Sequence, residues 1–119
     1  MRHMVPGDDT KLSHLRRGAL EYCVLALLVG RARYGLDIAR ELTRDGVLMS
    51  SEGTLYPLLA RLRKAGLVET SWQESTEGPP RRYYALTTAG AVALQEFRPA
   101  WRGFRDAVDA ALVTSEETR

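Results

Sequence analysis

The chain has 119 residues and a mass of 13.3 kDa, which suits one ordinary domain. Its residues are 45% hydrophobic and 27% charged, a balance that excludes a disordered or fibrous chain. The net charge is only +2, but residues 31–66 carry seven basic against four acidic side chains, so the basic excess lies in the middle of the chain.

The sequence excludes several classes of protein. No apolar run reaches the roughly 20 residues that cross a bilayer, and no signal-peptide pattern is present. One cysteine, Cys23, excludes an internal disulfide, and His3 and His14 are too few for a metal cluster. We therefore expect a small cytoplasmic domain that uses no metal, cofactor or membrane.

The N-terminal part of the chain predicts a tail followed by a helix. Residues 1–10 lack periodicity and contain a Pro-Gly-Asp-Asp run, which predicts a flexible tail. From Lys11 to Val29, apolar residues recur at helical spacing, in a stripe that includes Leu15, Ala19 and Cys23. The second half of this helix is apolar nearly all round, which indicates that it is covered on two sides.

Two more helices are predicted before residue 66. The first runs from about Tyr34 to Arg44 and ends at a following Asp-Gly pair. Ser51 is predicted to cap the next helix by accepting the backbone N–H near Thr54. Pro57 indicates either an opened first turn or a helix that begins later. The buried face of this helix is expected to hold the residues spaced i, i+3, i+4 and i+7, namely Leu55, Leu58, Leu59 and Leu62.

Beyond Gly66 the apolar period changes from 3.6 to 2. This predicts strands over 67–72 and 81–86, joined by a polar loop over 74–80. Thr87 can cap a last helix over 88–113, in which Pro99 is expected to cause a kink or a break, and residues 114–119 are expected to fray. The element order predicts a mainly α fold with a small β-hairpin. We expect a winged helix-turn-helix over residues 11–87 with a C-terminal helix over 88–113, whose aromatic stripe makes it the candidate dimerisation helix.

The outward face of the third helix is the main candidate functional surface. It is small in the middle, hydroxyl-bearing at its N-terminal end and basic at its C-terminal end, which suits entry into a DNA major groove. A solvated amphipathic helix with a basic end explains the same pattern equally well. The following hairpin favours DNA, because Arg81 and Arg82 at the base of the wing can reach phosphates or a narrow minor groove. The candidate DNA-binding residues are Tyr34, Ser51, Gly53, Thr54, Tyr56, Arg61, Lys64, Arg81 and Arg82.

Four motifs in order resemble the PadR family of bacterial transcriptional regulators. They are Tyr34-Gly35, the run from Ser51 to Leu62, the run from Ala65 to Val68, and the run from Arg81 to Gly90. The resemblance covers about residues 12–113 and implies a DNA-binding repressor, with a proline tolerated at position 57. The single final helix resembles the short PadR subfamily, whose members dimerise through their first and last helices.

The last helix also carries an aromatic stripe that indicates a homodimer. The expected interface residues are Leu15, Ala19, Cys23, Phe97, Trp101, Phe104 and Val108. A twofold dimer would present two recognition helices to a near-palindromic site on double-stranded DNA. The resemblance further implies that a planar aromatic compound can bind at the dimer centre, stacked on Trp101 between Phe97 and Phe104. Packing without any ligand explains these aromatic residues too.

The sequence also bears on two other classes of function. An enzyme would need Cys23 as a nucleophile, but its apolar neighbours favour the neutral thiol and no histidine stands at a spacing that supports a partner. We therefore expect no catalysis. A winged-helix module that binds protein instead of DNA is the alternative, although its surface would be apolar or acidic rather than basic.

Overall fold

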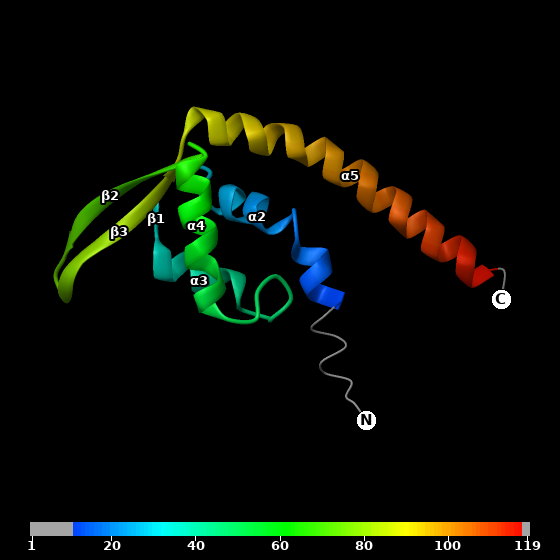
Figure 1. Cartoon of the computed structure of the whole chain (residues 1–119), viewed down its shortest axis with the longest axis horizontal. Helices are drawn as coiled ribbons and strands as arrows, with labels where there is room; N and C mark the ends of the chain where they lie inside the picture. Colours follow the sequence, from blue (N-terminus) through cyan, green and yellow to red (C-terminus); the bar gives the residue numbers. More distant parts are fainter. Residues whose placement is uncertain (1–10, 118–119) are drawn as a thin grey trace, which may run out of the picture.

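The computed structural model describes residues 11–117 of the chain. The predicted flexible tail at residues 1–10 lies outside this range, as do residues 118–119. The shorter helices cluster together, the small sheet extends from one side of them, and a long last helix extends from the other (Figure 1). The elements are α2 (Leu20–Leu27), β1 (Arg33–Tyr34), α3 (Gly35–Leu42), the 3-10 turn η1 (Glu52–Thr54), α4 (Leu55–Lys64), β2 (Val68–Ser75), β3 (Gly78–Leu86) and α5 (Thr88–Glu117).

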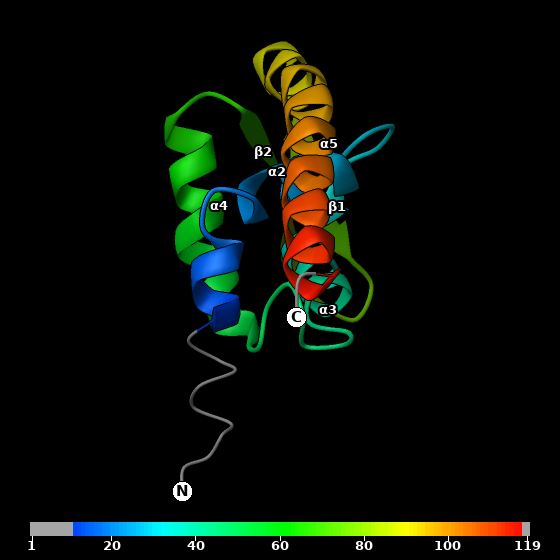
Figure 2. The same cartoon turned by 90° about the vertical axis from the view of Figure 1, so that its right-hand side faces the viewer.

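The predicted first helix over 11–29 is not continuous, and this prediction was wrong. Residues 11–16 are helical, a turn follows, and α2 then begins at Leu20. The turn contains Gly18 with φ at +84°, a left-handed conformation that ends a helix at low cost only for glycine. The break allows the helix over 11–16 to lie alongside the N-terminal half of α4 instead of continuing the line of α2 (Figure 2).

The third helix begins as the leucine spacing predicts, but its cap differs from the prediction. Ser51 precedes η1, and its hydroxyl lies 3.2 Å from the Thr54 hydroxyl rather than accepting a backbone N–H. Helix α4 then begins at Leu55, so Pro57 stands in its first turn, where a backbone N–H has no helical partner to lose. Of the two interpretations of Pro57, the later helix start is therefore the observed one: α4 begins at Leu55 and not directly after Ser51.

The sheet has three antiparallel strands in the order β1-β3-β2, whereas the sequence predicted two. Strand β1 is only two residues long and pairs with Tyr83 and Tyr84 of β3. The hairpin is also longer than predicted, because most of the expected loop over 74–80 is strand. Pro79 and Pro80 fit into β3 because a bulge shifts the register there, and no ladder hydrogen bond has to come from a proline.

Helix α5 runs through Pro99 without a break and continues past the predicted end at Val113 to Glu117 (Figure 1). Only the backbone N–H of one residue is lost at Pro99, and the surrounding turns keep the helix continuous while it bends gently. The start of α5 is held as predicted: the Thr87 hydroxyl accepts the Gly90 N–H at 3.0 Å.

Residues from α2, α3, α4, α5 and the sheet meet in one core. Leu25, Leu55 and Leu59 are fully buried at its centre, and Tyr84 and Leu94 close it from β3 and α5. The four leucines of α4 are all buried, which confirms the face that their spacing predicts. Within residues 11–117, no helix is both long enough and apolar enough to cross a membrane.

Candidate nucleic-acid interface

The face of α4 opposite its leucines is exposed and carries part of the predicted DNA-binding set. Arg61 and Lys64 stand at its basic C-terminal end, while Thr54 precedes its first turn. Ala60 in the middle is small and exposed, so it leaves room for base edges to come close to the helix backbone. Gly53 lies in η1, where even an added Cβ would meet nothing within 4 Å.

Tyr56 differs from the other exposed residues of α4 because its ring is partly packed. The rings of Tyr56 and Tyr84 both lie against Gly35, at the start of α3. Burial, followed by the nearby Glu52 carboxylate, raises the pKa of the Tyr56 hydroxyl. The hydroxyl therefore remains protonated at neutral pH and is available as a hydrogen-bond donor.

The two wing arginines lie on opposite faces of the hairpin, because successive strand residues alternate. The Arg81 guanidinium stacks 4.7 Å from the centre of the Tyr34 ring and approaches Glu77 at 4.0 Å. The Arg82 guanidinium stacks 4.9 Å from the centre of the Trp72 ring, on the face that holds the buried Tyr84 further along β3. The two arginines therefore cannot contact the same phosphate group from one face of the hairpin.

Tyr34 belongs to this wing assembly as well as to the start of α3. Its backbone pairs with Tyr83 in the sheet, and the two rings lie 5.9 Å apart. The sequence motif Tyr34-Gly35 pointed to Tyr34 as a candidate DNA-binding residue but did not predict strand β1. Two residues are too few to show the alternation that marks a strand.

A second candidate surface lies along α5 and the N-terminal helix. A groove of about 550 Å³ brings together five of the predicted interface residues: Leu15, Ala19, Cys23, Phe97 and Trp101. Phe104 and Val108 do not line the groove but continue its apolar side along α5, exposed. Tyr22, which sequence reasoning did not single out, stacks on Phe97 with ring centres 4.0 Å apart.

Cys23 in this groove is half-buried, and burial raises the pKa of its thiol. A raised pKa reduces the thiolate fraction at neutral pH, so the environment disfavours the nucleophilic form of the side chain.

A comparison with known families decides the identity of the fold. The model that describes the transcriptional regulator PadR-like family matches residues 24–96, from α2 to the first turns of α5. The chain belongs to the PadR-like family. The winged helix with a long C-terminal helix is accordingly the fold of a PadR-like, DNA-binding transcriptional regulator, as the sequence predicted.

Individual relatives resemble the chain over most of its length. A transcriptional regulator of Mycobacterium tuberculosis is 37% identical over 89 residues, which cover 75% of this chain and 81% of that protein. The structure of a PadR-like transcription factor from Bacteroides fragilis is 42% identical with a TM-score of 0.67, covering 82% of this chain and 94% of that one. A PadR family regulator from Eggerthella lenta is 32% identical with a TM-score of 0.76, over 92% and 97% of the two chains.

Proposed function

We propose that this PadR-like regulator is a homodimeric repressor that places one α4 from each protomer in successive major grooves of a near-palindromic operator. The observation that carries the proposal is the division of α4: its leucines are buried, and its opposite face exposes Thr54, Arg61 and Lys64. A twofold dimer repeats that face on the second half-site, roughly 34 Å away. The wing adds contacts from Arg82, and from Arg81 on its other face, to the flanking backbone.

The exposed apolar side of α5 supports the dimer. Trp101 is 42% exposed and Phe104 66% exposed in a single protomer, although both are large apolar side chains on one stripe. A stripe of that kind is unfavourable in water and is stabilised when a second copy covers it. The half-buried Ala19 and Cys23, with the exposed Leu15, extend the same surface toward the N-terminal helix.

The DNA interface is tested by fluorescence anisotropy with duplex DNA from the region upstream of the gene. We expect Arg61→Ala to weaken binding while the melting temperature stays nearly constant, because exposed charges contribute little to stability. The control is Arg44→Ala, which removes an exposed arginine that is paired with Glu41 on α3. Equal affinities for the wild type and both variants, or binding insensitive to salt between 50 and 200 mM, would contradict a DNA-binding role for α4.

The dimer is tested by light scattering at micromolar concentration. The wild type should have twice the protomer mass of 13.3 kDa. Phe104→Glu should yield protomers, because a carboxylate on the apolar stripe is costly to bury. Gln95→Glu, at an exposed position of the same helix, serves as the control. Repression requires that the wild type lowers transcription from its target promoter in vitro; an increase would indicate an activator.

The groove supports a second part of the proposal, the binding of a planar aromatic compound at the dimer centre. Trp101 offers an indole face, its ring centre lies 6.4 Å from that of Phe97, and Arg98 and Arg102 also line the groove. In a Trp72→Phe background, aromatic compounds should quench Trp101 emission saturably and release DNA. Saturable binding that survives Trp101→Ala would place the ligand elsewhere, and no quenching across a broad panel would leave Trp101 as packing.

A further inference from the structure

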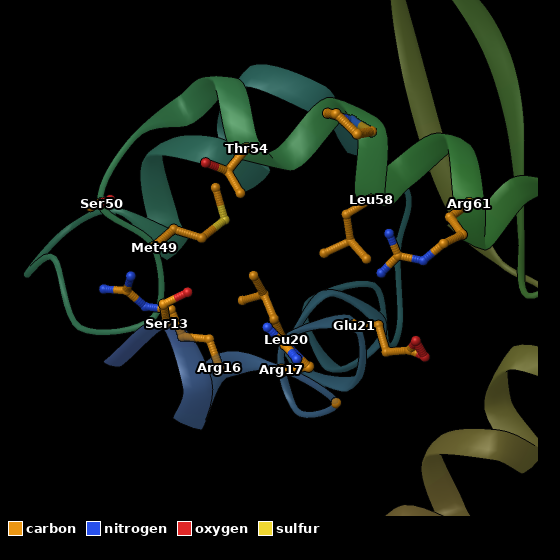
Figure 3. A pocket seen from close by; sticks show the side chains of 12 residues that line it. Ser13, Arg16, Arg17, Leu20, Glu21, Met49, Ser50, Thr54, Leu58 and Arg61 are labelled. Atoms are coloured by element: carbon orange, nitrogen blue, oxygen red, sulfur yellow. The ribbon is translucent and has the colours of Figure 1, made fainter. Parts of the chain in front are cut away.

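A cavity of about 620 Å³ lies between the N-terminal helix and α4, on the side of α4 away from the wing. Figure 3 shows Ser13, Arg16 and Arg17 along one wall, and Thr54, Leu58 and Arg61 along the other. Leu20 and Leu58 face each other at its floor, and Met49 and Ser50 close the end nearest Thr54. The cavity therefore joins the basic face of α4 to a segment that is distant from it in sequence.

The lining carries three guanidinium groups and one carboxylate, that of Glu21. Arg16 holds the wall in place, because its Nε donates to the Val47 carbonyl at 2.8 Å and its Nη2 donates to the Gly46 carbonyl at 2.7 Å. Arg17, the next residue, is exposed, as are Ser13 and Arg61. The excess positive charge and the hydroxyl groups favour an anionic group in this cavity.

The wall owes its position to the turn at Gly18. If the first helix continued unbroken into α2, Ser13 and Arg17 would follow the line of α2 rather than lie alongside α4 (Figures 1 and 2). The left-handed turn bends the chain back, so that α4 stands between the hairpin on one side and the helix over 11–16 on the other (Figure 1).

We propose that this cavity receives a phosphate of the DNA backbone, held by Arg17 and Arg61 with the Ser13 hydroxyl. The inference rests on the proposed entry of α4 into a major groove, because a helix in that groove has a sugar-phosphate strand on each side. The wing meets one strand, and the cavity meets the other. Arg61 accordingly contacts the backbone rather than base edges, since its side chain extends into the cavity (Figure 3).

The test is Arg17→Ala, measured by anisotropy on an operator duplex and on a scrambled duplex of equal length. A backbone contact carries no sequence information, so both duplexes should lose affinity by the same factor, roughly 3–10-fold at 100 mM salt. Loss of one phosphate contact should make the slope of log affinity against log salt shallower by about 0.9. The ratio of wild-type affinity to variant affinity should therefore decrease about 3.5-fold between 50 and 200 mM salt. Arg17→Lys, which keeps a charge without the planar fork, should recover most of the affinity.

Controls separate the failure of this inference from that of the proposed function. Arg44→Ala reports the effect of removing one paired surface arginine, and circular dichroism verifies that each variant is folded. If Arg17→Ala binds as tightly as Arg44→Ala while Lys64→Ala, on α4 but outside the cavity, is weakened, the cavity is not a backbone site but the role of α4 stands. If the wild type binds neither duplex, the proposed function itself fails.

Two further outcomes would overturn the inference. A loss on the operator alone would mean that Arg17 reads bases. A free anion is tested with millimolar pyrophosphate against sodium chloride of matched ionic strength. In the contrary outcome, pyrophosphate stabilises the wild type saturably against heat, loses that effect in Arg17→Ala, and releases more DNA than the chloride control does. If it does all three, the cavity is a site for a small phosphorylated compound instead.

Discussion

The junction between α4, the sheet and α5 depends on Thr87, and its replacement by alanine should destabilise the protein measurably. The Thr87 hydroxyl accepts the Gly90 N–H at 3.0 Å and donates to the Gly66 carbonyl at 2.7 Å. One side chain thus caps the start of α5 and ties it to the glycine that follows α4. The backbone N–H of Thr87 also donates to the Leu67 carbonyl at 3.2 Å, a bond that any residue except proline keeps.

The magnitude follows from the two lost hydrogen bonds. Loss of a helix N-cap costs about 1 kcal/mol. The Gly66 carbonyl can recover a water because this bond is exposed, so its loss adds about 0.5 kcal/mol, the low end of the usual range. We therefore expect Thr87→Ala to lower the free energy of unfolding by about 1.5 kcal/mol, equivalent to a fall in Tm of roughly 5–9 °C for a chain of this size.

The assay is urea unfolding followed by far-UV circular dichroism at one fixed protein concentration, because the stability of a dimer depends on concentration. Thr87→Ser keeps the hydroxyl and should stay near the wild type, while Thr88→Ala removes the neighbouring exposed threonine and should change little. A Thr87→Ala variant within 0.5 kcal/mol of the wild type would refute the capping role. So would a serine variant as unstable as the alanine variant.

Three other predictions concern packing, the wing and the thiol. Gly90→Ala should destabilise the protein in the same unfolding assay by about 1–3 kcal/mol, because a Cβ there would overlap the Leu67 carbonyl oxygen. Gly103→Ala has open space around it and should stabilise α5 by roughly 0.5–1 kcal/mol, so equal effects of the two substitutions would contradict the close contact at Gly90. Trp72→Ala should weaken DNA binding in the anisotropy assay with little change in Tm, because the exposed indole orients the Arg82 guanidinium stacked on it; unchanged affinity would mean that this stacking serves no role in binding. Burial raises the pKa of the Cys23 thiol, so iodoacetamide at pH 8 should alkylate the folded protein more slowly than the urea-unfolded chain, and equal alkylation rates would contradict the raised pKa. The free energy of unfolding should also fall as the pH rises through 9, because the thiol of the unfolded chain ionises before that of the folded protein.

The sequence alone determined the elements whose signals are local. The leucine spacing in α4 specified which side of that helix is buried, because four apolar residues on one face can be satisfied only by a core. The alternation in β2 and β3 specified a hairpin, and Thr87 specified the start of α5 through a hydrogen bond to a residue three positions away. The exposed basic face of α4 followed as the complement of its buried face.

Only the tertiary structure decided the features that depend on distant partners. Gly18 ends a helix here, while Gly103 and Pro99 lie inside one, and these residues have no local signal that separates the two outcomes. Strand β1 exists because β3 offers it a pairing edge, since two residues cannot form a strand by propensity. The cavity beside α4 also depends on distant partners, because the fold brings Arg17 and Arg61 to opposite walls of one cavity and their separation in sequence gives no sign of it.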